Sequence, residues 1–205
     1  MRPDNGISVV IPAAGLSTRM GQSKLTLPWR STTIIGQIIE TISSCGLSNI
    51  FIVTDKINLV LNDHLDQLAK AFPISRIDKP ECEDENMLSS IQVGLKTVKE
   101  SCDAVLISLA DQPQIQADTI EKLISGFAHD KDKIVVPSFN LHRGHPWLLP
   151  KSFFDDFLEI KPPLSARNFL IANNSLIRYV AIDNESIFRD IDTPLDYQNS
   201  LPSSN

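Results

Sequence analysis

Short apolar runs alternate along the chain with stretches in which apolar residues recur every three or four positions. The apolar runs are typical of buried strands, and they cover residues 7–11, 49–54, 74–77, 103–109 and 134–137. Helical spacing is carried by isoleucines between Ile34 and Ile42, and it recurs in residues 61–72, 87–98 and 120–127. Strand and helix alternate four times, which predicts an α/β protein with a mostly parallel sheet, covered by helices on both faces in a three-layer α/β/α arrangement.

The pattern changes after Pro137. Residues 139–149 predict two short strands around an Arg-Gly-His-Pro turn, residues 151–159 and 165–172 predict short helices, and residues 176–182 predict a strand. Thr193-Pro194 is a helix start, with a capping residue followed by proline at the first helical position. Because no Gly-, Ser- or Pro-rich linker separates the two parts, we expect residues 1–205 to form a single domain.

Composition narrows the function classes. A chain of 205 residues with a net charge of −6 is a poor candidate for general nucleic-acid or membrane-surface binding. The polar first residues do not resemble a signal peptide, and no apolar run approaches the ~18 residues of a membrane span. The cysteines, Cys45, Cys82 and Cys102, lack Cys-x-x-Cys spacing. They therefore favour neither a disulfide framework nor a zinc site, and we expect a cytoplasmic protein.

The first strand opens into a loop of small residues suited to phosphate. Gly15 can adopt positive φ, so that backbone N–H groups converge on an anion. Arg19 offers a planar fork to phosphate oxygens, and Lys24 offers a point charge. The spacing excludes a Walker A loop and the dinucleotide fingerprint. The alternative is a surface loop with two solvated cations.

Three carboxylates are candidates for metal chemistry. Asp111 follows the strand of residues 103–109, at the sheet edge where ligands of parallel sheets bind. A carboxylate there suits Mg²⁺, although an Asx-turn before Pro113 is the alternative. Alternation in a short strand would place Asp190 and Asp192 on one side and Ile191 on the other. The alternative for Asp190 is a position at a solvated strand edge, and the alternative for Asp192 is a role in the turn before Thr193-Pro194.

An ordered set of motifs resembles the molybdenum cofactor cytidylyltransferase family over residues 9–197. The motifs are Ala-Ala-Gly-Leu-Ser-Thr-Arg-Met-Gly-Gln-Ser-Lys at 13–24, Ser-Ile-Gln-Val-Gly-Leu at 90–95, Arg-Gly-His-Pro at 143–146 and Ser-Ala-Arg at 165–167. The resemblance implies a Rossmann-like nucleotidyltransferase fold of the GT-A type. It also implies a nucleotide-binding half over about 7–137 and an acceptor-substrate half over about 138–201.

The resemblance assigns roles to these motifs. It implies that the nucleotide is bound by Ala13, Ala14, Gly15, Arg19, Lys24 and Ser90, with Lys24, Arg19 and Asp111 catalytic. It implies Mg²⁺ on Asp111 and Asp192, and an acceptor bound by Arg143, His145 and Arg167. Since His145 precedes a proline, we expect an extended backbone and an outward-reaching ring. The alternatives are a Ser90 hydroxyl bonded to the local backbone, a His145 imidazole that is hydrogen-bonded at the surface or in the core, and a helix-surface position for Arg167.

By this resemblance, molybdopterin attacks the α-phosphorus of CTP through its terminal phosphate, and pyrophosphate leaves. We expect CTP to be preferred over GTP, because the Cβ of Ala14 narrows the base pocket. We also expect a monomer, with a molybdoenzyme as possible recipient of the product. The sequence departs from the family pattern in the segment before Ser89. In the family this segment usually carries a glycine, whereas here it carries Glu81, Glu83, Asp84 and Glu85. The alternatives are another phosphorylated acceptor such as a sugar or polyol phosphate, a nucleotide-sugar glycosyltransferase, and a non-catalytic cofactor carrier.

Overall fold

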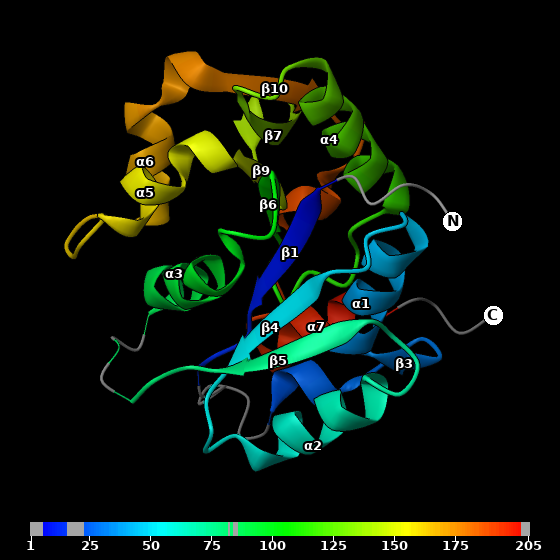
Figure 1. Ribbon diagram of the computed structural model, residues 1–205. Coiled ribbons are helices and arrows are strands. Elements are labelled where there is room, and N and C mark those ends of the chain that lie inside the picture. The colour runs from blue at the N-terminus through cyan, green and yellow to red at the C-terminus, as the bar shows by residue number, and fades with distance from the viewer. Residues whose placement is uncertain (1–5, 16–22, 82, 84–85, 202–205) are drawn as a thin grey trace.

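A computed structural model describes residues 6–15, 23–81, 83 and 86–201, and its centre is one eight-stranded sheet (Figure 1). The strand order is β10 (Ile177–Ala181), β7 (Ile134–Phe139), β9 (Trp147–Pro150), β6 (Ala104–Ile107), β1 (Ile7–Pro12), β4 (Ile50–Thr54) and β5 (Ile74–Asp78), with β8 (His142–Arg143) paired to β7. The pairs formed by β1 with β4 and β6, by β4 with β5, and by β7 with β10 are parallel. Only β8 and β9 pair antiparallel within this sheet, so the predicted mostly parallel sheet is confirmed.

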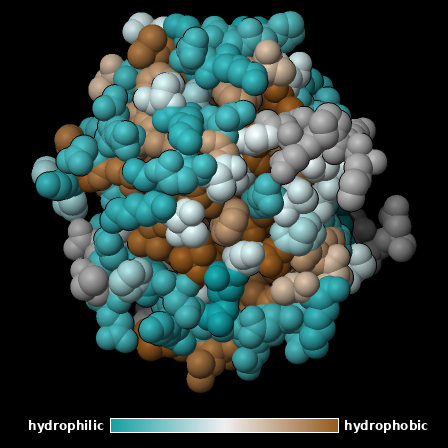
Figure 2. Space-filling model, in the orientation of Figure 1, coloured by the Kyte–Doolittle hydropathy of each residue, from teal (hydrophilic) through white to brown (hydrophobic). Residues whose placement is uncertain are grey.

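Helices cover both faces of the sheet, as the strand–helix alternation predicts. Their bounds are α1 (Ile34–Ser44), α2 (Leu59–Leu68), α3 (Met87–Val98), α4 (Ala117–His129), α5 (Phe154–Leu158), α6 (Ala166–Ala172) and α7 (Pro194–Ser200). The apolar sides of α1, α2 and α4 pack into one buried cluster, while those of α3, α5 and α6 pack into a second cluster across the sheet. On the side of the molecule that faces the viewer, hydrophilic residues surround apolar ones that gather toward the middle (Figure 2).

Alternation along β1 explains how one strand supplies both cores. Val9 and Ile11 are fully buried in the cluster with α1, and Val10 between them is fully buried in the cluster with α3. Gly94 lets α3 lie close against this strand, because a Cβ there would approach Cγ1 of Val10 to 2.5 Å. A glycine in this helix is therefore required by packing.

Among the described residues, capping side chains start the helices α1, α2, α3, α6 and α7. The Thr33 hydroxyl accepts the N–H of Gly36 at the start of α1, and the Asn86 amide oxygen accepts the N–H of Ser89 at the start of α3. Thr193 and Asp196 form a reciprocal capping box at α7, with Pro194 at the first helical position, as the Thr-Pro pair predicts. The caps of α3 and α7 fix the starts of two helices that lie next to the cleft described below.

The structure differs from the sequence-based prediction in two short segments. A hairpin of β2 (Pro28–Trp29) and β3 (Thr32–Thr33) follows a 3₁₀ turn at Lys24–Thr26, and the sequence pattern does not predict it. The strand predicted around Asp190–Asp192 is wrong, because residues 189–193 form no strand. No helix within the described ranges is long and apolar enough to cross a membrane. Cys45 and Cys102 are buried, and their Sγ atoms donate to the carbonyls of Thr41 and Val98, while Cys82 lies outside the described residues.

Candidate active site

A cleft of about 730 Å³ opens at the carboxyl ends of β1 and β6. Six separate parts of the chain meet in it, and the described residues that line it are 12–15, 24–25, 86–87, 109–112, 143–145, Ile187, Phe188, Asp190 and Asp192. Loops that leave the carboxyl ends of parallel strands share one edge of the sheet, and this is where ligands of open α/β sheets bind. The sequence motifs that lie far apart along the chain therefore converge.

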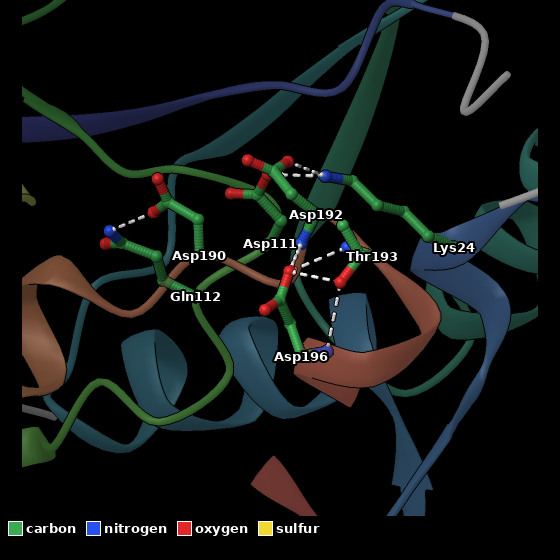
Figure 3. Close-up of polar contacts among 7 residues, drawn as sticks. All are labelled: Lys24, Asp111, Gln112, Asp190, Asp192, Thr193 and Asp196. Carbon is green, nitrogen blue, oxygen red and sulfur yellow. Dashed lines mark hydrogen bonds and ion pairs between the residues drawn. The ribbon is translucent and has the colours of Figure 1, made fainter. Parts of the chain in front are cut away.

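Lys24 bridges two carboxylates at one wall of this cleft (Figure 3). Its Nζ lies 2.7 Å from Oδ2 of Asp111 and 3.0 Å from Oδ1 of Asp192. Burial alone would lower the pKa of Lys24, but the charge of Asp111 and the hydrogen bonds to both carboxylates outweigh it and raise the pKa above 10.5. The ammonium group is therefore a bound cation held between two carboxylates.

A backbone hydrogen bond positions this carboxylate pair. The N–H of Ile191 donates to the carbonyl of Asp111 at 3.0 Å, and the Ile191 side chain is fully buried. Its neighbours Asp190 and Asp192 both line the cleft, although residues 189–193 form no strand.

Gln112 is a functional candidate that the sequence reasoning missed. It is buried, and its Nε2 donates to Oδ1 of Asp190 at 2.6 Å (Figure 3). Burial raises the pKa of Asp190, the hydrogen bond from Gln112 opposes this, and the charges of Asp111 and Asp192 add to the increase. Gln112 thus holds a third carboxylate next to the bridged pair.

The small-residue loop also has a partner that the sequence reasoning missed. Gly15 has a φ of +130°, and its N–H donates to Oδ2 of Asp55 at 2.6 Å. Asp55 follows directly after β4, at the same sheet edge. One N–H of this loop is therefore already directed at a negative oxygen, which is the property expected of a phosphate-binding loop. Ala13, Ala14 and Gly15 all line the cleft.

His145 lines the cleft, but the prediction of an outward-reaching ring is wrong. Its ring centroid lies 5.2 Å from that of Trp147, and its Nε2 is buried without a hydrogen-bond partner among the described residues. Burial lowers the pKa of His145 to about 4. At neutral pH the imidazole is therefore uncharged, and it offers one ring nitrogen to a ligand as donor or acceptor.

The other predicted site residues have different outcomes. Ser90 is buried and its hydroxyl donates to the Asn86 carbonyl at 3.2 Å, so the local-backbone alternative describes this side chain, while Asn86 itself lines the cleft. Arg143 lines the cleft, whereas Arg167 is exposed on α6 and does not. Arg19 lies outside the described residues. Their roles in binding remain predictions.

The carboxylate pair fits a divalent cation. Two hard oxygen donors already converge on a positive charge, at the edge of a cleft that is open for further oxygens from a ligand. Within the part of the chain that the structure describes, no group of three or more His, Cys, Asp or Glu side chains is arranged to hold a metal ion. A cation on Asp111 and Asp192 would consequently take its remaining ligands from a substrate or from water.

Residues 9–176 match the MobA-like NTP transferase domain family. The molybdenum cofactor cytidylyltransferase of Escherichia coli (strain K12) is 29% identical over 195 residues, which cover 94% of each chain. Among solved structures, Rv0371c from Mycobacterium tuberculosis H37Rv in complex with manganese matches with a TM-score of 0.75 at 22% identity, covering 97% of this chain and 99% of that one. A CMP:2-keto-3-deoxy-manno-octonic acid synthetase complexed with CTP matches with a TM-score of 0.74 at 14% identity, covering 94% and 95%. The two structures share the fold of this chain.

Proposed function

The chain belongs to the MobA-like NTP transferase domain family and is a nucleotidyltransferase, and we propose that it transfers CMP from CTP to the phosphate of molybdopterin. In this reaction a phosphate oxygen of the acceptor attacks the α-phosphorus of CTP, and pyrophosphate leaves. The choice of acceptor is supported by the relative from Escherichia coli, which is similar over 94% of both chains. The choice of CTP is supported by the same relative and by Ala14 in the loop that lines the cleft.

One observation carries the proposal: Lys24 lies between Asp111 and Asp192 in a cleft of about 730 Å³. Phosphoryl-type transfer requires little covalent chemistry from the protein, so positioning and neutralisation of charge dominate catalysis. A lysine beside two carboxylates is suited to both tasks.

We assign a divalent cation, Mg²⁺ in the cell, to Asp111 and Asp192. When bound, such a cation neutralises phosphate charge and orients the phosphate oxygens of both substrates. The manganese complex of a protein with the same fold supports a divalent cation in this architecture. Lys24 then holds phosphate oxygens of CTP and stabilises the charge that develops during transfer.

The remaining residues bind and orient. The segment of residues 12–15 presents backbone N–H and C=O groups to the nucleotide, and we assign Arg19 to its phosphates. We assign Arg143 and His145, which line the cleft on the turn of residues 143–145, to the acceptor. His145 is uncharged at neutral pH, so it orients the acceptor by a hydrogen bond and adds no positive charge.

The test is release of pyrophosphate from CTP, GTP, ATP and UTP with purified molybdopterin, in the presence of Mg²⁺. We expect turnover with CTP and molybdopterin, and a rate at least about tenfold lower with GTP, since discrimination by fit is typically worth ~1–3 kcal/mol. Ribitol 5-phosphate replaces molybdopterin as the control acceptor. Turnover with ribitol 5-phosphate and none with molybdopterin would assign the enzyme to the other acceptor class.

We also propose a monomeric cytoplasmic enzyme whose product passes to a molybdoenzyme. The number and spacing of the cysteines, which favour no disulfide framework, support a reducing compartment. Sedimentation of the purified chain tests the monomer.

A further inference from the structure

Phe188 is an aromatic side chain on the wall of the cleft that no catalytic step uses. It lies in a 3₁₀ turn at Glu185–Phe188, close to the carboxylates of the site, and it is 38% exposed although large apolar side chains are normally buried. The same turn supplies Ile187 to the cleft lining. An exposed aromatic ring in a concave site offers an apolar face to a ligand.

The ring of Phe188 packs against two other aromatic side chains. Its centroid lies 6.3 Å from that of Phe139 in a tilted arrangement and 6.5 Å from that of His142 in an edge arrangement. Phe139 ends β7 and His142 begins β8, so these partners belong to the sheet. We call Phe188, Phe139 and His142 the aromatic shelf.

Close backbone contacts also hold the shelf against the turn of residues 143–145. The N–H of His145 donates to the Ile187 carbonyl at 3.1 Å. Gly144 approaches the same residue so closely that an added Cβ would lie 2.2 Å from the Ile187 carbonyl oxygen. The ring of Phe188 is therefore presented by a preformed surface, which lowers the entropy lost when a ligand binds.

A cation lies in the same part of the cleft. Arg143 lines the cleft two residues before His145, and within the described ranges its guanidinium makes no hydrogen bond or ion pair. Phe188 and Arg143, which both line the cleft, thus offer a flat apolar face and a fork-shaped group that binds phosphate. A ligand that matches both has a planar ring system and a phosphate group.

We propose that Phe188 determines acceptor specificity by stacking on the planar ring of the acceptor while Arg143 binds the phosphate of the same molecule. This inference rests on the proposed function, and it identifies the ring-binding residue of the acceptor site. A sugar or polyol phosphate would bind Arg143 equally well but would leave the face of Phe188 against hydroxyl groups, which lose hydrogen bonds to water there. Stacking on the shelf therefore selects a planar acceptor over a polyol.

The inference is tested by direct binding, without turnover. Neopterin 3′-phosphate is a fluorescent pterin that carries a phosphate, and its fluorescence reports binding to the full chain. We expect Phe188→Ala to weaken binding by about tenfold, the size of a lost stacking interaction. Phe188→Tyr and Phe188→Trp should restore binding, whereas Phe188→Leu, which is apolar but not planar, should restore it only in part.

Leu141→Ala is the matched control, because Leu141 lies in the β7–β8 turn at 99% exposure and does not line the cleft. We expect this variant to bind the probe like the wild type, and all variants to bind CTP equally. An unchanged affinity of Phe188→Ala, a wild type that does not bind the probe, or a loss of CTP affinity in place of probe affinity would each overturn the inference. Pyrophosphate release with molybdopterin decides the proposed function separately, because the binding result does not depend on turnover.

Discussion

Lys24 occupies the place between Asp111 and Asp192 where a divalent cation would bind, and this leads to a prediction about metal affinity. If the ammonium group and a metal ion compete for the same carboxylates, removing the ammonium charge should strengthen metal binding in the absence of nucleotide. Lys24→Met tests this, because methionine keeps much of the length of the side chain and removes its charge.

The size of the effect follows from the two contacts. The hydrogen bond to Asp111, whose side chain is 22% exposed, is charge-assisted and worth about 1.5–3 kcal/mol. The contact with Asp192, whose side chain is 52% exposed, is discounted to about 0–1 kcal/mol for solvent screening. A competing interaction of about 2 kcal/mol corresponds to about 30-fold in affinity. We therefore expect the Mn²⁺ dissociation constant of Lys24→Met to be about 30-fold lower than that of the wild type.

The assay is titration of the nucleotide-free protein with Mn²⁺, followed by electron paramagnetic resonance of the free ion. Lys24→Arg keeps the charge and should bind Mn²⁺ like the wild type. Lys122→Met removes a lysine that pairs with Asp118 at 2.6 Å on α4, outside the cleft, and should also have no effect. The same Lys24→Met variant should lose more than ~10²-fold in turnover, because charge stabilisation in transfer is lost. An unchanged Mn²⁺ affinity of Lys24→Met would show that lysine and metal do not share one site.

Three further predictions concern the metal ligands, the base and the buried histidine. Asp111→Asn and Asp192→Asn should each raise the Mg²⁺ concentration that gives half-maximal turnover, because an amide keeps the shape and loses the charge; a wild-type Mg²⁺ titration would remove that residue from the ligand set. Ala14→Gly should shift the ratio of kcat/KM for CTP and GTP toward GTP while activity with CTP is kept, because the base pocket widens; equal wild-type values for CTP and GTP would contradict this reasoning. Burial lowers the pKa of His145 from 6.5 to about 4, so the unfolded chain takes up a proton below pH 6.5 that the folded chain takes up only near pH 4. The free energy of unfolding of the wild type should therefore fall between about pH 7 and about pH 4.5, by up to about 3 kcal/mol, as measured by urea unfolding. The fall should be smaller in His145→Asn and unchanged in the exposed control His142→Asn.

The fold follows closely from the sequence because its signals are local. Periodicity of apolar residues distinguishes strands from helices, and the predicted elements between residues 7 and 182 correspond to observed ones. The hairpin of β2 and β3 has two residues in each strand, which is too short for any alternation to be recognised. The antiparallel insertion of β9 between β6 and β7 is likewise set by tertiary packing, for which the pattern of a single strand carries no information.

The site was predicted where chemistry and chain position coincide, and missed where long-range contacts define a residue. Lys24 and Asp111 follow from residue type and from their positions after strands, Asp192 follows from the family resemblance, and the structure brings the three together. Gln112 and Asp55 acquire their candidate roles from partners 78 and 40 residues away, which no local pattern reveals. His145 likewise lies at a bend, and its ring contact with the buried Trp147 is a property of the folded chain that no local pattern reveals.

A single buried residue connects the fold to the metal chemistry. Ile191 has its side chain in the core with α1 and α4 and its N–H on the carbonyl of Asp111. Because neighbouring side chains in an extended segment point in opposite directions, burying Ile191 directs both Asp190 and Asp192 into the cleft. The backbones that carry Asp111 and Asp192 are thus joined by a hydrogen bond beside a packed core. If nucleotide and metal draw Lys24 away from the carboxylates, this backbone contact would remain, as a preorganised site requires.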